Sequence, residues 1–252
     1  MKILLLGHNG YLGSYLYKNL YVDILNDRKI YNNGTKYDYI INCIGKPSLE
    51  YCEINEIETN YANYGILEDI KTYYPSSKII NFSSYYVYNC EGFCHESSNT
   101  TKKYNYSKQK LKSESLVENG VTFRLGKLFG HQDLNKQNKL TEYIIKNNDI
   151  MLDTVKFNPT SLNQVLNIIN YELKNNTLYG IYNLSNDGFC SHYEYGSYIG
   201  KLLGDTKKIN KIENIGKNFD NYGKFLMSCE KIKKYTVLTP WQLDLELYLK
   251  SL

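Results

Sequence analysis

The sequence predicts an α/β protein with a doubly wound parallel sheet, followed by a smaller C-terminal lobe. Two observations support this fold class. Short apolar runs alternate with helical patterns through the first half of the chain, which is typical of parallel strands joined by helical crossovers. A glycine-punctuated turn also joins the first apolar run to the first helical pattern. We expect a sheet-forming domain over residues 1–130 and an intertwined lobe over residues 131–252.

Each element follows from a local pattern. Residues 2–6 form an apolar run that predicts a buried strand, and leucines at helical spacing predict a helix over residues 11–20. Residues 22–25 predict a second strand, but residues 26–36 leave room for at most a turn or two of helix in its crossover. Further strands are expected at 40–44, 78–82, 121–125 and 180–184, and helices at 54–69, 104–118, 139–147, 162–174, 193–203 and 244–250.

Composition argues against several classes of protein. The chain has 252 residues, is 42% hydrophobic, and contains no apolar run of about 20 residues, so no membrane-spanning helix is expected. Its net charge of +4 is mild, and Arg28 and Arg124 are the only arginines among 30 basic residues. Because arginine is the preferred side chain for bidentate phosphate and guanine contacts, we expect no nucleic-acid partner.

Cysteine usage predicts a reducing environment. The six cysteines are too sparse for a disulfide scaffold in a chain of this length, so free thiols and a cytoplasmic location are expected. The N-terminal apolar stretch is too short for the core of a signal peptide. Cys90, Cys94 and His95 lie close together but do not match a zinc pattern, and no metal site is expected.

The glycine turn carries the first chemical prediction. Gly7, Gly10 and Gly13 follow a strand and open a helix, the context in which a Rossmann-type turn admits a pyrophosphate at a helix N-terminus. An acidic residue about 20 positions further on would bind the adenosine ribose. Asp27 stands there with Arg28 beside it, so the sequence leaves both NAD and NADP open.

A tyrosine and a lysine four residues apart would share one helix face and could donate a proton to a ketone. The chain has 27 tyrosines and 28 lysines, so about three such pairs are expected by chance, and three are present. Pro75 follows Tyr74 and argues against a helix there. The pairs that remain are Tyr104 with Lys108 and Tyr106 with Lys110.

Neighbouring motifs resemble a known family. Residues 81–88 resemble the strand that ends in a hydroxyl residue and an aromatic pair in extended short-chain dehydrogenase/reductases, and residues 104–108 resemble the Tyr-x-x-Ser-Lys of that family. The likeness is strongest to the dTDP-4-dehydrorhamnose reductase-like nucleotide-sugar reductases. It continues in order through residues 41–45, 52–60, 123–130, 159–161, 180–185 and 231–241. This register selects Tyr104 and Lys108.

The resemblance implies NAD(P)H-dependent reduction of a nucleotide-linked 4-keto-6-deoxyhexose at C4, with dTDP or UDP as the nucleotide. Tyr104 would be the acid, Lys108 would favour its phenolate and hold the nicotinamide ribose, and Ser84 would bind the carbonyl oxygen. The cofactor residues expected are Gly7, Asn9, Gly10, Tyr11, Leu12, Gly13, Gly45, Asn60, Tyr104 and Lys108. The substrate residues expected are Ser84, Tyr86 and Lys127.

Two alternatives stay open. Bifunctional 3,5-epimerase/4-reductases of the superfamily carry a cysteine where Tyr86 stands and a basic residue near Lys139, of which only the second is present. A catalytically silent NADP-binding regulatory subunit would keep the fold, although an intact Ser84, Tyr104 and Lys108 set argues against it. The family also leaves a homodimer open. His8, His131 and His192 have no acidic neighbour at an informative spacing, and no role is predicted for them.

Overall fold

The computed structural model describes residues 1–25, 30–131, 139–204, 207–212 and 225–252. The chain divides into two compact units. The first unit comprises residues 1–88, 100–125 and 172–182, and the second comprises residues 89–99, 126–171 and 183–252. The single boundary predicted at residue 130 therefore differs from the observed division, because one short segment leaves the first unit early and another returns to it late.

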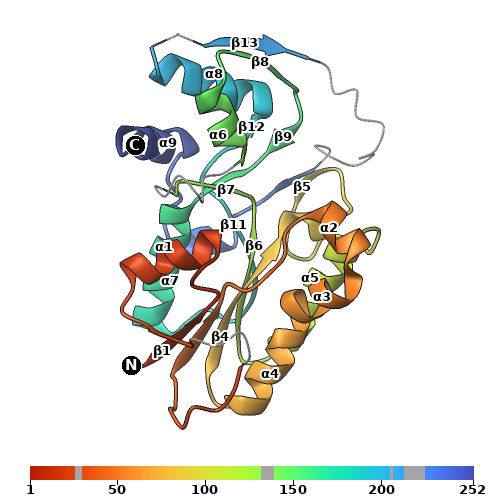
Figure 1. Ribbon diagram of the computed structural model, residues 1–252, viewed down its shortest axis with the longest axis vertical. Helices are drawn as coiled ribbons and strands as arrows, with labels where there is room; N and C mark the ends of the chain where they lie inside the picture. Colours follow the sequence, from red (N-terminus) through yellow and green to blue (C-terminus); the bar gives the residue numbers. More distant parts are fainter. Residues whose placement is uncertain (26–29, 132–138, 205–206, 213–224) are drawn as a thin grey trace. The chain divides into compact units, whose positions relative to one another are not determined.

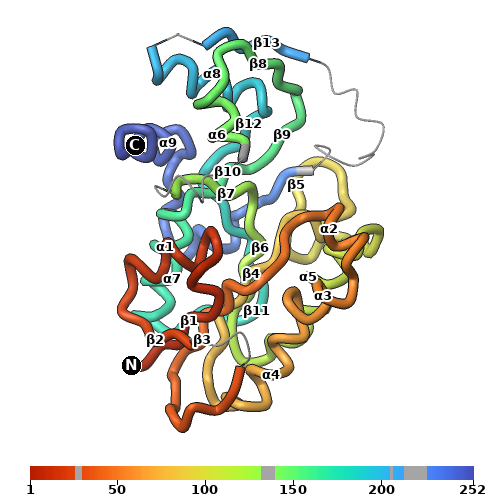
Figure 2. The backbone as a smooth tube through the Cα atoms, viewed as in Figure 1, coloured from red at the N-terminus to blue at the C-terminus, as the bar shows by residue number. Residues whose placement is uncertain are grey.

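The first unit is built around a six-stranded sheet in the order β11-β6-β4-β3-β1-β2. The pairs from β2 to β6 are all parallel. Figure 2 shows β1, β2 and β3 side by side, and Figure 1 draws α1 on one side of the sheet and α4 on the other. The strands span Ile3–Leu6 (β1), Asp23–Ile24 (β2), Tyr39–Asn42 (β3), Lys78–Ser84 (β4), Gly120–Leu125 (β6) and Gly180–Leu184 (β11). This arrangement confirms the predicted α/β class.

Burial explains why these segments are strands. β1, β3, β4 and β6 are buried at every position, as expected of parallel strands covered on both faces. The helices of this unit are Tyr11–Asn19 (α1), Leu49–Ile54 (α2), Glu56–Asn60 (α3), Ile66–Tyr73 (α4) and Asn105–Leu116 (α5). A core of Leu4, Ile40, Ile66, Leu67 and Ile70 joins β1 and β3 to α4.

The helix predicted over residues 54–69 begins earlier, at Leu49, and is broken. Between α3 and α4 the chain forms a π-helical turn at Tyr61–Gly65. Such turns insert one extra residue and are frequent at functional sites. Here the turn directs Asn63 into the interior, where it is only 2% exposed.

The second unit contains small two-stranded sheets and the remaining helices. Its core includes Phe129, Phe157, Tyr195, Trp241 and Leu245. Its strands span Gly92–Cys94 (β5), Lys127–Phe129 (β7), Asp149–Leu152 (β8), Lys156–Phe157 (β9), Pro159–Ser161 (β10), Cys190–Ser191 (β12), Lys208–Lys211 (β13) and Phe225–Met227 (β14). Its helices are Lys139–Lys146 (α6), His192–Leu202 (α8) and Trp241–Lys250 (α9), while Leu162–Asn175 (α7) runs from this unit into the first.

Cys90 and Cys94 form a disulfide, with Cα atoms 6.3 Å apart, whereas the sequence predicts free thiols. Both cysteines lie on the excursion between Tyr88 and Thr100, which are paired by an antiparallel bridge. The two cysteines are four residues apart, and their spacing alone does not indicate this contact. The four other cysteines are free. Among the described helices, none is long and apolar enough to cross a membrane.

Candidate active site

The end of β4 places Ser84 beside a tyrosine of α5. Ser84 is 7% exposed, and its Oγ accepts a hydrogen bond from the Tyr86 backbone N at 3.3 Å. Burial raises the pKa of Tyr106 to about 12, and the nearby Ser84 side chain partly opposes this shift, which places the phenol close to that hydroxyl. At neutral pH Tyr106 is therefore a protonated phenol, able to donate its hydrogen to an oxygen placed next to Ser84.

Aromatic rings border this pair. Tyr85 and Tyr86 stack with centroids 4.4 Å apart, and Tyr86 meets the Tyr106 ring edge-on at 6.2 Å. Burial raises the pKa of Tyr86 to about 12, so this phenol is also neutral near pH 7. The structure thus places Tyr86, one of the predicted substrate residues, next to Ser84 and Tyr106.

Lys110 lies one helical turn after Tyr106 on the same face of α5. It is 7% exposed, its Nζ donates to the Phe82 carbonyl oxygen at 2.9 Å, and the ammonium lies 6.0 Å from the Tyr106 ring centroid. Burial lowers the pKa of Lys110 to about 8, although the Glu114 charge acts against the shift. This lysine can therefore lose or regain a proton near neutral pH.

The loop after β3 reaches Lys110 at Gly45. A Cβ added to Gly45 would lie 3.5 Å from Lys110 Nζ and 3.3 Å from Asn63 Oδ1. Asn63 accepts from the Lys46 backbone N at 2.7 Å and donates to Gln109 Oε1 at 2.6 Å. The π-helical turn thus ties this loop to α5. Asn63 was not among the predicted residues, because the extra residue of a π turn leaves no mark in the sequence pattern.

The predicted glycine turn forms a cradle for an anion. Gly7 has a φ of +79°, which favours glycine, and a Cβ on Gly13 would lie only 2.0 Å from the Gly7 carbonyl oxygen. Gly10 is the N-cap of α1, and no acidic side chain occupies the first turn of that helix. Such a helix N-terminus suits a pyrophosphate. Of the other residues predicted to bind the cofactor at this turn, Asn9 is exposed, Tyr11 is half-buried, and Leu12 is buried.

The structure does not bring Tyr104 and Lys108 to Ser84. Tyr104 is the N-cap of α5, and Lys108 is exposed, with its Nζ donating to Asn105 Oδ1 at 3.0 Å. Two positions along an α-helix turn a side chain by about 200°, so only one of the two Tyr-x-x-x-Lys pairs can face Ser84. The predicted register differs from the structure by two residues.

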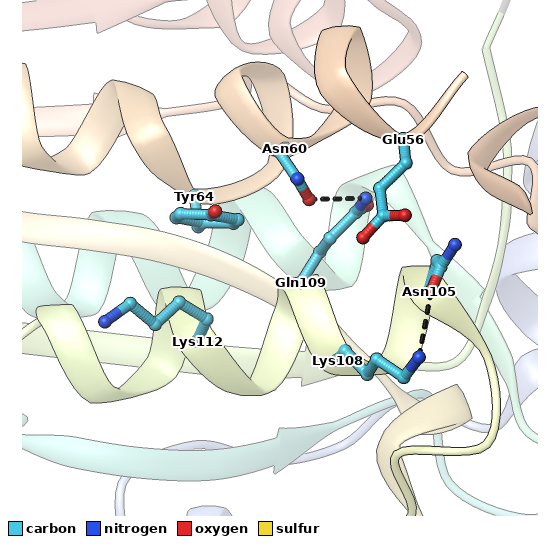
Figure 3. Close-up of a pocket in the computed structure, with 7 residues that line it drawn as sticks. All are labelled: Glu56, Asn60, Tyr64, Asn105, Lys108, Gln109 and Lys112. Atoms are coloured by element: carbon cyan, nitrogen blue, oxygen red, sulfur yellow. Dashed lines mark hydrogen bonds between the residues drawn. The ribbon is translucent and has the colours of Figure 1, made fainter.

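Lys108 instead lines a separate pocket of about 230 Å³ between α3 and the outer side of α5. Figure 3 shows Asn60 in the same pocket, where its amide oxygen accepts from Gln109 Nε2 at 3.0 Å. Gln109 also accepts from Asn63, so Asn60 is linked to the loop at Gly45 only indirectly, through the Gln109 amide. The pocket is lined by Glu56, Asn60, Tyr64, Asn105, Lys108, Gln109 and Lys112.

A sequence signal for the observed register exists further along the helix. Glu114 continues the stripe of Tyr106 and Lys110 at a spacing of four. It binds Arg124 of β6 through two hydrogen bonds, from Nε to Oε1 at 2.9 Å and from Nη2 to Oε2 at 2.7 Å. A buried arginine requires an acidic partner, and the acid on the Tyr106 stripe would have identified the inward face.

Lys127, the third predicted substrate residue, belongs to the second unit. Its Nζ lies 3.1 Å from Nε2 of His192. Asp27 and Arg28 lie outside the described residues, as does the side chain of Lys139, so the structure gives no test of their expected roles.

Known proteins share this sequence pattern and this fold. The family model for the RmlD substrate binding domain matches residues 1–252. No curated protein sequence matches the chain. A dTDP-4-dehydrorhamnose reductase from Clostridium acetobutylicum is 20% identical, with a TM-score of 0.85 and 99% of each chain covered.

Two further structures share the fold at similar distance. A dTDP-4-dehydrorhamnose reductase from Bacillus anthracis, in complex with NADP, is 18% identical, with a TM-score of 0.84 and all of both chains covered. A dTDP-4-dehydrorhamnose reductase from Yersinia enterocolitica is 19% identical, with a TM-score of 0.87 and 99% of each chain covered. At these identities the structural likeness establishes the fold.

Proposed function

Because the chain belongs to the RmlD substrate binding domain family, we propose that it is an NAD(P)H-dependent reductase of a nucleotide-linked 4-keto-6-deoxyhexose. The observation that carries the proposal is the group formed by Ser84, Tyr106 and Lys110 in the first unit. The same unit contains the glycine cradle. It also contains Gly45, on the loop after β3, which lies close to Lys110. Structures with this fold include one in complex with NADP.

The cofactor fits the residues present. A Cβ on Gly13 would lie 2.0 Å from the Gly7 carbonyl oxygen, so glycine at this position lets α1 pack closely on β1, and the N-terminus of α1 at Gly10 is where a pyrophosphate would bind. Lys110, close to Gly45, would contact the nicotinamide ribose. When bound, the reduced nicotinamide would supply the hydride that the ketone carbon accepts.

The protein supplies the proton and the environment for charge. We assign Tyr106, in place of the predicted Tyr104, as the acid that donates its phenolic hydrogen to the developing alkoxide. Ser84 donates to the same oxygen and holds it near Tyr106. Lys110, in place of Lys108, then stabilises the Tyr106 phenolate by its charge and can pass on its own proton. Tyr86 would lie against the sugar.

An assay with defined ketones tests the function. The purified protein should oxidise NADPH or NADH when dTDP-4-keto-6-deoxyglucose or its UDP counterpart, each with or without prior C3,C5 epimerisation, is supplied. The same nucleotide sugars with a hydroxyl at C4 should cause no oxidation and serve as the control. Tight dinucleotide binding without turnover on any of these ketones would contradict the proposal and favour a regulatory subunit.

The pKa of Lys110 predicts a pH dependence. A lysine is charged below its pKa, so raising the pH through about 8 removes the charge next to Tyr106. We expect kcat/KM for ketone reduction to fall above about pH 8, by up to about tenfold per pH unit. Lys110→Arg should move this alkaline decline upward, because arginine stays charged.

Lys108→Arg is the matched control, since Lys108 lies on the same helix but lines the other pocket. Its pH profile should coincide with that of the unmodified protein. An alkaline decline that stays in place in Lys110→Arg would exclude Lys110 as its source.

A further inference from the structure

Three titratable side chains of the second unit form a chain of hydrogen bonds that the proposed catalytic group does not use. Nζ of Lys127, on β7, lies 3.1 Å from Nε2 of His192, the first residue of α8. Nδ1 of the same imidazole lies 2.8 Å from Oδ1 of Asp153. Phe157 covers the group, with its ring centroid 4.9 Å from the imidazole and 5.3 Å from the ammonium.

The donors fix the protonation state of this trio. An ammonium can only donate, so Nε2 of His192 accepts from Lys127. The one hydrogen of the neutral imidazole then lies on Nδ1 and is donated to Asp153. Burial, followed by the nearby Lys127 charge, lowers the pKa of His192, which agrees with a neutral ring near pH 7.

The surroundings of Lys127 disfavour its charged form. Burial lowers its pKa, and among the described residues it forms no ion pair, because the Asp153 carboxylate is bound to His192 instead. A lysine carries three donors, and only one is used in this contact. Lys127 is half-buried, and a partly desolvated cation without a paired anion is stabilised when a ligand provides the anion.

The other ionisable groups around the trio add no charge that a ligand could use. The Cys190 thiol, next to Lys127, is neutral because burial raises its pKa. Glu194 accepts a hydrogen bond from the Ser191 backbone N as part of the capping box of α8. The charge available to a ligand therefore comes from Lys127 and from whatever proton His192 can gain.

We propose that Lys127, His192 and Asp153 form a phosphate-binding site that takes up one proton when the ligand binds. With a neutral imidazole the trio has no net charge. When a proton from solvent binds Nε2 of His192, that nitrogen changes from acceptor to donor, and Lys127 is released from it. Both side chains then donate to the phosphate oxygens, and Asp153 stabilises the imidazolium from the other side.

This inference rests on the proposed function for its ligand, because the diphosphate of a nucleotide sugar is the phosphate that such an enzyme meets. Binding of a proton and of the anion must then favour each other to the same extent. Affinity for the nucleotide sugar should rise as the pH falls from 8 to 6, by at most about tenfold per pH unit. The nucleoside without phosphate should show no such dependence.

Isothermal titration calorimetry with dTDP-glucose tests the site without any turnover. Its diphosphate is esterified at both ends and so does not titrate near neutrality, unlike a terminal phosphate with a second pKa of about 6. Titrations at pH 7 in buffers of different ionisation enthalpy should show uptake of about half to one proton. His192→Gln should abolish this uptake while binding persists, and Lys127→Gln should weaken binding at least about tenfold.

Lys156→Gln is the matched control, because this exposed lysine lies on the neighbouring strand β9 and should leave both affinity and proton uptake unchanged. If a variant fails to fold, the imidazole resonance of His192 in the unmodified protein gives the same answer, since its titration should move to higher pH on adding dTDP-glucose. Equal proton uptake in His192→Gln, or binding without proton uptake in the unmodified protein, would overturn the proposal. Either result would leave the reductase assay unaffected, so the two proposals can fail separately.

Discussion

We expect Tyr106→Phe to lower kcat/KM for reduction of the nucleotide-linked ketone by at least about 100-fold. The change removes one oxygen from a ring that stays in place against Tyr86, so packing is retained while the acid is lost. Steady-state oxidation of NADPH, with dinucleotide binding followed separately, measures the effect. Binding should persist, because the glycine cradle is untouched.

Tyr104→Phe provides a control of the same chemistry two residues away. Tyr104 is the N-cap of α5, whereas Tyr106 lies close to Ser84, so we expect this variant to keep kcat/KM within about twofold. A large loss in Tyr104→Phe with activity retained in Tyr106→Phe would restore the register predicted from the sequence and contradict the structural assignment.

The second large effect concerns stability. Glu114→Ala should lower the free energy of unfolding by about 3–5 kcal/mol, because it leaves the Arg124 guanidinium buried without its carboxylate. Arg124 and Glu114 side chains are each 4% exposed, and Ser83 also donates to Glu114 Oε1, at 2.6 Å. Urea unfolding followed by circular dichroism measures the change.

Glu118→Ala is the comparison. Glu118 pairs with Lys71 at 2.6 Å, but its side chain is 76% exposed, so solvent replaces the partner when the carboxylate is removed. We expect the midpoint of unfolding to stay close to that of the unmodified protein. Similar losses in both variants would mean that burial does not distinguish the two pairs.

The sequence was informative where burial produces a simple pattern. Apolar runs predicted the strands of the first unit, including the short segment at residues 22–25, where β2 is observed. The glycine turn could also be predicted from the sequence, since the close contact between Gly13 and Gly7 leaves few other residue types possible there. Both features depend on neighbours close in sequence.

The catalytic helix could not be read in the same way. The inward face of α5 is polar, with Tyr106, Gln109, Lys110 and Glu114 all buried, so no apolar stripe indicates which side faces the sheet. In a chain so rich in tyrosine and lysine, the expected motif occurs in both registers. The proximity of Tyr106 to Ser84, 22 residues earlier, distinguishes the two registers, and only the fold provides it.

Contacts distant in sequence were missed for a related reason. Asp153 and His192 meet only because β9 and β12 pair, and no spacing rule predicts a partner 39 residues away.

A homodimer and a cytoplasmic location stay predictions. The disulfide between Cys90 and Cys94 indicates that reduction state is worth measuring in the purified protein.

The chain passes between its two units after residues 88, 99, 125, 171 and 182. Each unit is therefore assembled from three separate segments, and no single cut separates one from the other. A gene fragment ending after residue 88, 99, 125 or 171 would encode an incomplete first unit, and one ending after residue 182 would still lack the last segment of the second unit. Exchange of a whole unit with a related protein would have to replace three segments together. We therefore expect variation in this architecture to accumulate by point substitution and loop change, because a single crossover cannot exchange one intact unit.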